Sequence, residues 1–443
     1  MLDGQRLAPD RRLGGRRPPG DALDLRRIVH QRCEPVPALS GGGYLAAKEG
    51  VVVVALNYRV GALGFLAGVA GIRGNQGLED QQLAMRWVKD NAARFGGDPD
   101  RIAIFGESAG AMSVGLHELS IPSSDGLFRA AIQQSNPMGI PYKSPAQAAV
   151  SGALFAKNLG CEGQSLECLQ QVSVDEILTQ QSAVSLQLLS LLGARLAGFL
   201  VFAPVVDGDF VVADPAVAAS ATGVPLPTLM GTNAADGNIF IAGIAQEVGG
   251  GKISAAEYVT VLGLLFGAEN AQQIVELYGV VPDGDNAQNL SNVATDYLFG
   301  CANQYVARTA RSSTHVYRFD ENTINVWPGV ALCEGQACHA DDLPFTFHVD
   351  RTLGATFTPA QALLSDEMIG YWGGFARQVD PNGGDRLGWP RFRATGLEYM
   401  LLDSPLSTTV DPIANCASWD RIGYEIDNPV RVMTTRAEAA PAE

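Results

Sequence analysis

The sequence predicts an α/β fold built on a mostly parallel, buried sheet, and three observations indicate it. Residues 51–56 form a wholly apolar, largely β-branched run, which is typical of a strand covered on both faces. Apolar residues then recur at helical spacing over 77–95, before the helix-ending run Gly-Gly-Asp-Pro. A second β-branched run, 102–105, leads into another helix. Strands and helices therefore alternate, as in a parallel sheet.

The turn after that second strand reads Gly-Glu-Ser-Ala-Gly over residues 106–110. G-x-S-x-G between a strand and a helix is the pattern of a nucleophile elbow, a sharp turn with serine at its tip. Side chains at Gly106 and Gly110 would collide with the neighbouring strand and helix, so glycine is expected at both positions. The helix that begins after Ser108 directs backbone N–H groups toward developing negative charge. A Gly/Ser turn without a catalytic role is the alternative that the motif alone leaves open.

The rest of the chain continues the alternation of strands and helices. Further strand regions are expected at 128–135, 202–208, 227–233 and 316–319. Helical tracts are expected at 145–192, 254–278, 290–311 and 365–379. The tract 145–192 is interpreted as a helical cap over the carboxyl edge of the sheet, where α/β proteins bind their ligands.

Composition excludes several classes of protein. The chain has 443 residues, 47% hydrophobic and 18% charged, which is enough for a large core. Its net charge of −16 argues against nucleic acid as a partner. No secretory signal is visible in the first residues, and the most apolar region, about 183–206, is interrupted by Gln187, Arg195 and Pro204. We therefore expect no membrane span.

The first forty residues differ in composition from the rest. Residues 1–32 hold eight arginines and four aspartates, a net charge of +4 on an otherwise acidic chain. This stretch is rich in Arg, Pro and Gly and has no strand or helix periodicity. We expect residues 1–40 to be disordered or foreign to the fold, 41–424 to form one domain, and 425–443 to be a polar tail.

The chain has seven cysteines, and none has the C-x-x-C spacing of a zinc site. An even set with one left over, Cys33, fits about two disulfides and an extracytoplasmic compartment. Buried free thiols are the alternative.

A serine nucleophile needs a base, and the chain offers five histidines. His30 lies in the arginine-rich segment, and His117 lies on the helix that follows the elbow, too far along it to reach back. His339 lies in a Cys/Ala/Asp loop far downstream and is the leading candidate, with His315 and His348 as alternatives.

The base needs an orienting carboxylate, which should end a strand between the serine and the histidine. Asp236 fits this position best, and Asp207 is its competitor. Each is followed by glycine, so each could equally be a turn aspartate. Asp341 and Asp342 lie too close to His339 in the sequence and are expected to cap a turn.

Several segments, in order from about residue 44 to 420, resemble the type-B carboxylesterase family, the group that includes cholinesterases and bacterial para-nitrobenzyl esterases. They are VVVVALNYRVGALGFL, GNQGLEDQQLAMRWVKDNAARFGGDP, IAIFGESAGAMS, PVVDG, GTNAADGNIF, ACHADDLPFTF, YWGGFARQVDPNGG and CASWD. The resemblance implies an α/β-hydrolase fold with a mostly parallel sheet and helices on both faces. It implies a small-molecule ester as substrate and two-step acyl transfer without a metal or organic cofactor.

The resemblance also assigns roles to individual residues. Ser108 matches the nucleophile, His339 the base, and Ala109 the oxyanion-hole residue after the nucleophile. Asp236 stands where the family usually has glutamate, so its shorter side chain must approach the imidazole more closely. Cys161 and Cys168 match a disulfide loop of the family, and Cys301 with Cys338 is the candidate for a second pair.

The front of the chain departs from the family pattern. The family's upstream edge strands and its His-Gly-Gly-Gly loop, which supplies two oxyanion donors, have no counterpart. Gly42 and Gly43 are candidates for those donors, and a glycine turn before the next helix is the alternative.

Three functions remain open. The first is an active carboxylic ester hydrolase with a Ser-His-Asp triad. The second is a catalytically impaired, truncated homologue or a non-enzymatic binding module of the same fold. The third is another acyl-serine enzyme, such as an amidase or a lactonase.

Overall fold

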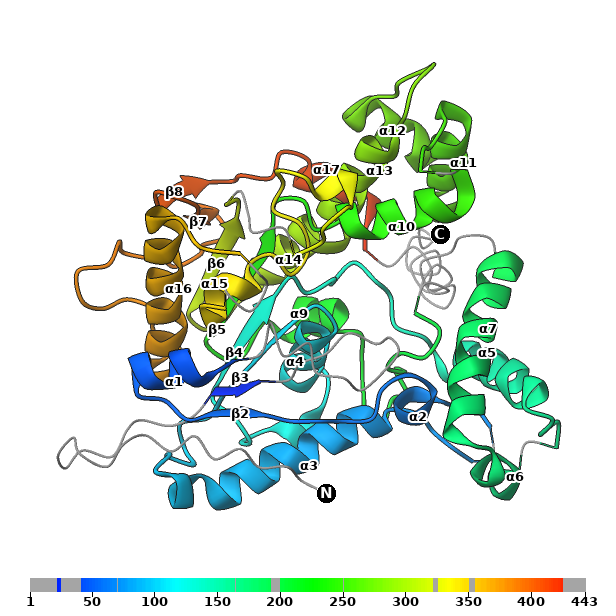
Figure 1. The fold of residues 1–443 in the computed structure, drawn as a ribbon, viewed down its shortest axis with the longest axis horizontal. Coiled ribbons are helices and arrows are strands. Elements are labelled where there is room, and N and C mark those ends of the chain that lie inside the picture. The colour runs from blue at the N-terminus through cyan, green and yellow to red at the C-terminus, as the bar shows by residue number, and fades with distance from the viewer. Residues whose placement is uncertain are drawn as a thin grey trace, which may run out of the picture.

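An eight-stranded sheet forms the centre of the computed structural model, which describes residues 22–24, 41–69, 71–163, 165–192, 200–249, 251–321, 326–349 and 355–424 (Figure 1). The strand order is β2-β1-β3-β4-β5-β6-β7-β8. All neighbouring pairs are parallel except β7 and β8. The strands are β1 (Ala22–Asp24), β2 (Val53–Ala55), β3 (Ala103–Glu107), β4 (Ala130–Gln134), β5 (Thr228–Asn233), β6 (Thr314–Phe319), β7 (Glu398–Leu402) and β8 (Ser407–Val410).

Helices cover both faces of this sheet because its central strands are apolar on both sides. Every residue of β3, β4 and β5 is buried. Phe105 and Ile132 pack on one face against α1 (Gly43–Glu49), α15 (Leu343–Phe347) and α16 (Pro359–Gln378). Ile104 and Ala131 pack on the other face, with Met85 and Val114 from the helices there. The alternation follows from the two-residue period of a strand.

The helices of that second face include those on either side of the elbow strand. They are α3 (Gln76–Asn91) with the 3₁₀ turn η2 (Ala92–Phe95), α4 (Ala109–Leu119) with η3 (Pro122–Ser124), α9 (Pro215–Thr222) and α14 (Cys301–Ala307).

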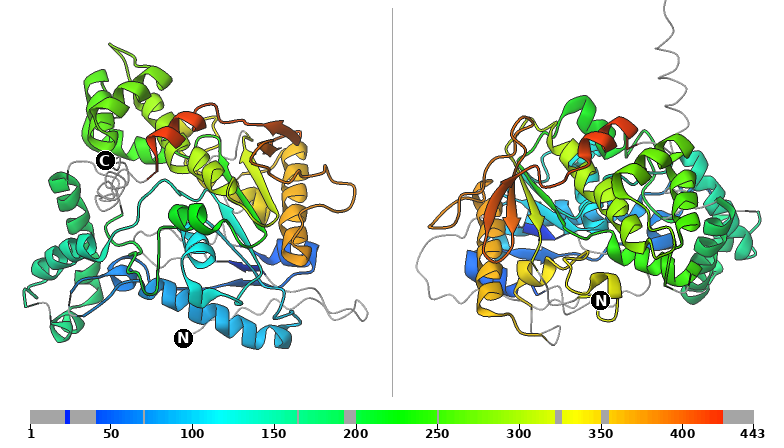
Figure 2. Two further views of the ribbon diagram at one scale, coloured as in Figure 1. Left: turned by 180° about the vertical axis from the view of Figure 1, so that it is seen from behind. Right: turned by 90° about the horizontal axis from the view of Figure 1, so that it is seen from above.

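Two helical lobes extend from the sheet at the end of the molecule away from α16 (Figures 1 and 2). The first contains α2 (Gly61–Phe65), α5 (Pro145–Asn158), α6 (Leu166–Gln171) and α7 (Val174–Leu192). The second contains α10 (Asn238–Gly249), α11 (Ala255–Phe266), α12 (Ala268–Tyr278), α13 (Ala287–Ala294), the π-helical turn η4 (Thr295–Gly300) and α17 (Cys416–Ile422). A short 3₁₀ turn, η5 (Ala331–Cys333), precedes α15. Within the described part of the chain, no helix has the length and apolar character that crossing a membrane requires.

The fold class expected from the sequence is confirmed. Within residues 1–40, Ala22–Asp24 form strand β1 between β2 and β3, and the expectation that this segment is disordered or foreign to the fold stays a prediction. Only three residues form this strand, which is too short for periodicity to reveal. The other residues of 1–40, and the expected tail 425–443, lie outside the described residues. Among the described strands β2 is the outermost on this side.

Three disulfides connect the described cysteines, and one of the two expected pairings is wrong. Cys161 pairs with Cys168. Cys301 pairs with Cys416 instead of Cys338, because Cys301 begins α14 and Cys416 begins α17, which packs against it. Cys338 pairs with Cys333, five residues earlier in the chain.

Candidate active site

The serine of the elbow lies at the tip of the turn between β3 and α4. Ser108 has φ 56° and ψ −119°, a backbone conformation that non-glycine residues adopt only under constraint. Its N–H donates to the carbonyl of Gln134 at the end of β4, 2.9 Å away, and its carbonyl accepts from Met112 in the first turn of α4. The neighbouring strand and the helix together therefore hold the strained residue in place.

The elbow glycines permit a close approach of strand and helix. A Cβ atom at Gly106 would lie 2.5 Å from the carbonyl carbon of Gly110. Real side chains do not approach backbone this closely, so any residue other than glycine here would force the strand and the helix apart.

Asp236 follows β5 and is hydrogen-bonded to His339. The Nδ1 atom of His339 lies 2.8 Å from Oδ1 of Asp236, and both side chains are buried. The second carboxylate oxygen, Oδ2, accepts from the backbone N–H of Asn233 at 2.8 Å. The shorter side chain of aspartate therefore reaches the imidazole while a backbone donor fixes its orientation.

The other ring nitrogen of His339 faces Glu107. Nε2 lies 3.2 Å from Oε1 of Glu107 and makes no hydrogen bond with any residue that the structure describes, Ser108 included. Catalytic hydrogen bonds are often open before substrate binds, so this geometry is compatible with a base. Glu107 was not among the site residues predicted from the sequence. Its place directly before the serine was a usable signal, because that place puts its carboxylate at the sheet edge that carries the serine.

Carboxylates around His339 favour its protonated form. Burial by itself lowers the pKa of this imidazole, but the charges of Glu107, Asp236 and Asp342 outweigh it and raise the pKa to about 9. Asp342 is fully buried and accepts hydrogen bonds from Gln134 at 2.8 Å and from the hydroxyl of Tyr317 at 3.0 Å. Its own pKa is raised, chiefly by burial.

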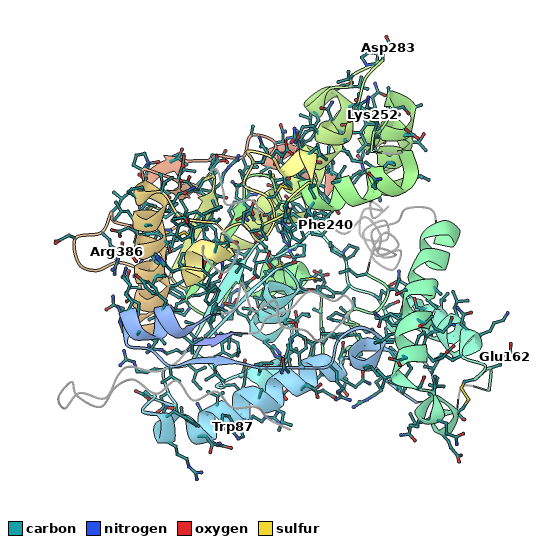
Figure 3. All side chains as sticks on the ribbon, viewed as in Figure 1. Trp87, Glu162, Phe240, Lys252, Asp283 and Arg386 are labelled. Carbon is teal, nitrogen blue, oxygen red and sulfur yellow. A yellow bond between two sulfur atoms is a disulfide. The ribbon has the colours of Figure 1, made fainter. Side chains whose placement is uncertain are left out.

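Two aromatic rings pack beside the imidazole. The ring centres of Phe240 and Phe299 lie 5.0 and 5.2 Å from that of His339, and the two phenyl rings stack at 5.9 Å. Phe240 is half-buried and lies near the start of α10, at the inner end of the second lobe and near the centre of the molecule in Figure 3. Both residues were missed by sequence analysis, because an isolated phenylalanine in a helical tract resembles any core residue.

The other histidines lie elsewhere. His117 is bonded to Ser124 and Gln81 in the core, and burial lowers its pKa to about 3. Burial also lowers the pKa of His315, to about 4. The Nδ1 atom of His348 lies 2.9 Å from the hydroxyl of Ser365.

The other candidate carboxylates, Asp207 and Asp341, accept hydrogen bonds from backbone N–H groups of their own turns. Oδ1 of Asp207 accepts from the backbone N–H groups of residues 209, 210 and 211. Asp341 accepts from the N–H of Cys338 at 2.8 Å and so closes the turn that contains His339.

The oxyanion candidates lie in two different places. Ala109 is the first residue of α4, so its N–H has no acceptor within the helix and lies directly beside Ser108. A Cβ atom at Gly42 would lie 2.6 Å from Val53 of β2. Val53 pairs with Ala22 of β1, and Ala22 pairs with Ala103 at the start of β3, so Val53 and Ala103 lie at the same height in the sheet. Five residues of strand, about 16 Å, separate that level from Ser108. This placement argues against Gly42, and against its neighbour Gly43, as oxyanion donors, because both lie at the N-terminus of α1, level with the start of β3 and away from Ser108 at its end.

A serine on an elbow turn, at the sheet edge where a buried His–Asp pair also lies, defines the class of α/β-hydrolase-fold serine hydrolases. The chain belongs to the carboxylesterase family, which it matches over residues 36–418. Among the described residues there is no group of three or more histidine, cysteine or acidic side chains arranged to hold a metal ion.

Individual relatives support this assignment. The cAMP-regulated D2 protein of Dictyostelium discoideum is 32% identical over 381 residues, covering 83% of this chain and 69% of the relative. Acetylcholinesterase of Bungarus fasciatus is 32% identical over 414 residues, covering 86% of this chain and 65% of the relative. The chain thus spans about two thirds of the length of these curated relatives. The solved structure of a PNB esterase superposes with a TM-score of 0.74 at 28% identity, covering 91% of this chain and 81% of that structure.

Proposed function

We propose that this chain hydrolyses small carboxylic esters through an acyl-serine intermediate, with Ser108 as nucleophile, His339 as base and Asp236 as the carboxylate that orients it. The single observation that carries the proposal is the buried 2.8 Å hydrogen bond between His339 and Asp236, formed at the sheet edge that carries the strained serine. Similarity to esterases of the family supports the same reaction.

The His339–Asp236 hydrogen bond determines which nitrogen does the chemistry. An Nδ1–H that donates to Asp236 leaves Nε2 as the proton acceptor of the neutral ring. Nε2 removes the proton of Ser108 as its oxygen attacks the ester carbonyl, and then returns that proton to the leaving alcohol. In the second half of the cycle the same nitrogen activates the water that releases the acid.

Ala109 supplies an N–H group for the oxyanion of the tetrahedral intermediate. This N–H is at the first turn of α4, so the positive end of the helix dipole adds to its effect. Each preorganised donor contributes about 10²–10³ in turnover, so the completeness of the oxyanion hole sets how fast this chain works.

The aromatic pair beside the base favours an apolar substrate group. The ring centres of Phe240 and Phe299 lie 5.0 and 5.2 Å from that of the imidazole, and Phe240 is half-buried while Phe299 packs behind it in the core. Short acyl esters with an aromatic alcohol fit such surroundings, because their apolar surface is removed from water when it packs against these rings. The retained serine, histidine and aspartate favour an enzyme over a binding module of the same fold.

The test compares hydrolysis of para-nitrophenyl acetate and butyrate by the wild type and by Ser108→Ala. We expect the variant to lose about 10⁶-fold in kcat, as is typical when a serine nucleophile is removed. Circular dichroism of both proteins checks that they are equally folded. Equal, slow rates for the two proteins would show that the chain is not an esterase and would favour the binding-module interpretation.

A further inference from the structure

The Cys333–Cys338 disulfide lies directly beside the base. Cys338 immediately precedes His339, and the two cysteines, five residues apart, are among the most buried in the chain, at 1% and 0% exposed. The sulfur bridge closes the loop that leads from η5 to the histidine.

One end of this loop is joined to the turn that carries the acid. Ala235 and Cys338 form a parallel β-bridge, in which the N–H of Ala235 donates to the carbonyl of Ala337 at 2.9 Å. The side-chain amide of Asn233 donates to the carbonyl of Cys338 at 2.6 Å. The residues on either side of the His339–Asp236 hydrogen bond are therefore held together by one backbone and one side-chain hydrogen bond.

The other end of the loop is joined to the same turn. The side-chain amide of Asn238, two residues after Asp236, donates to the carbonyl of Leu332 at 2.5 Å. Cys333 and Cys338 also pack against Ala235 in one small apolar cluster. The disulfide thus connects two points of the chain that each contact the acid turn.

The backbone at the base is under constraint. Ala340, directly after His339, has φ 67°, a left-handed conformation that alanine adopts only where its surroundings impose it. Within the same turn the N–H of Asp341 donates to the carbonyl of Cys338 at 3.1 Å, and the indole N–H of Trp327 donates to the carbonyl of His339 at 2.5 Å. The disulfide to Cys333 fixes Cys338, so the strained turn that contains His339 begins at a residue that is held in place.

A role in global stability explains this disulfide poorly. In the chain-entropy account, a disulfide constrains the unfolded chain more as its loop grows longer. Cys301–Cys416 spans 115 residues, whereas Cys333–Cys338 spans five and so gives the smallest gain of the three. What a five-residue bridge does fix is local geometry.

We propose that Cys333 and Cys338 are positioning residues for the base: their disulfide holds the backbone of His339 so that the imidazole stays hydrogen-bonded to Asp236. The expected loss of kcat rests on the proposed esterase function, whereas the expected change in the His339–Asp236 hydrogen bond does not.

The test compares the double variant Cys333→Ala/Cys338→Ala with the matched control Cys161→Ala/Cys168→Ala. The control disulfide has a separation of seven residues, so its removal has a similar effect on the unfolded chain. It lies next to Glu162 at the outer tip of the α5–α7 lobe, far from Phe240 and the base (Figure 3).

Two readouts separate positioning from stability. The first is the downfield proton resonance of the His339 Nδ1–H in its hydrogen bond to Asp236, assigned by its loss in Asp236→Asn. We expect it to broaden or vanish in Cys333→Ala/Cys338→Ala and to persist in the control. The second is the kcat for para-nitrophenyl acetate, measured well below the melting temperature of each protein. We expect kcat to fall about 10²-fold with KM little changed, as for a catalytic group misplaced by about 1 Å.

The outcomes are distinguishable from those of the proposed function. If the wild type shows the resonance but no turnover, the esterase proposal fails while the resonance still tests positioning. If both double variants keep the resonance and the wild-type kcat, the bridge is structural only and the inference is overturned. A wild type without the resonance contradicts the His339–Asp236 hydrogen bond itself, and the inference with it.

Discussion

The elbow that carries Ser108 and the loop that carries His339 are held in place by different kinds of contact. The elbow is positioned by its own neighbours in sequence, a buried strand before it and a helix after it, with Gly106 packed against Gly110. The histidine loop has no regular strand or long helix of its own. It is positioned by contacts with Asn233, Ala235 and Asn238, about a hundred residues earlier, and by a disulfide.

This difference explains how the two halves of the site tolerate change. A contiguous motif keeps its geometry as long as its own residues are kept. A loop fixed by distant partners depends on each of them, so its geometry can fail through substitutions that never touch the histidine. Three substitutions test this contrast, beginning with the one of largest expected effect.

Asp236→Asn removes the charge that orients the histidine while preserving the shape of the side chain. An amide at this position can also donate to Nδ1, which favours the tautomer that cannot accept a proton at Nε2. We expect kcat for para-nitrophenyl esters to fall by about 10⁴ at the pH optimum. A loss of less than tenfold would mean that the histidine half does not need its carboxylate, and Asp207→Asn, outside the site, provides the comparison.

Gly106→Ala introduces a side chain into the close contact between β3 and α4 at the elbow. The added Cβ would meet the carbonyl carbon of Gly110 at 2.5 Å, so strand and helix must separate. We expect a free energy of unfolding lower by roughly 1–3 kcal/mol and a kcat about 10²-fold lower, measured by urea titration and by ester hydrolysis. Gly263→Ala in α11 is the matched control, because its Cβ meets nothing within 4 Å. That variant should gain up to about 1 kcal/mol in stability and keep full activity, since alanine is the better helix former.

Glu107→Gln removes the charge of the residue through which the serine elbow contacts His339. The charge of Glu107 helps to raise the pKa of His339 to about 9, and a base must be neutral to accept a proton. Removing that charge lowers the pKa, so the acid limb of the kcat/KM profile should move to lower pH by about 1–3 units. Glu118→Gln, a buried glutamate bonded to Thr228 in the core, should leave the limb in place. An unmoved limb in Glu107→Gln would show that this carboxylate does not control the base.

The same division between local and distant contacts determines what the sequence could predict. The strand, elbow and helix around Ser108 follow from contiguous residues, and the structure has them where the pattern places them. The strand before Asp236 was equally readable, because every residue of β5 is buried. Glu107 and Phe240 were missed, since their contacts with His339 join separate elements of the chain.

Cysteine pairing and short strands were the weakest predictions. Four cysteines can pair in three ways, and only the packing of α17 on α14 decides that Cys301 meets Cys416. Strands β7 and β8 were not expected, because Glu398–Leu402 and Ser407–Val410 lack a clear alternation. They become strands by pairing with each other and with β6. Strand β1 is three residues long and depends in the same way on its neighbours.

The Cys301–Cys416 disulfide gives the site an unusual covalent arrangement. It closes a ring of chain that contains His339, while Ser108 and Asp236 both lie outside that ring. A single backbone cut within the ring would leave the molecule in one covalent piece, with the base still attached through either Cys301 or Cys416. A cut between Ser108 and Asp236, outside the loop closed by Cys161–Cys168, would instead place the nucleophile and its partners on fragments that no described disulfide joins, held together by non-covalent contacts such as the pairing of β3, β4 and β5. The enzyme's tolerance of nicking should therefore differ between its two halves, with the serine on the vulnerable side.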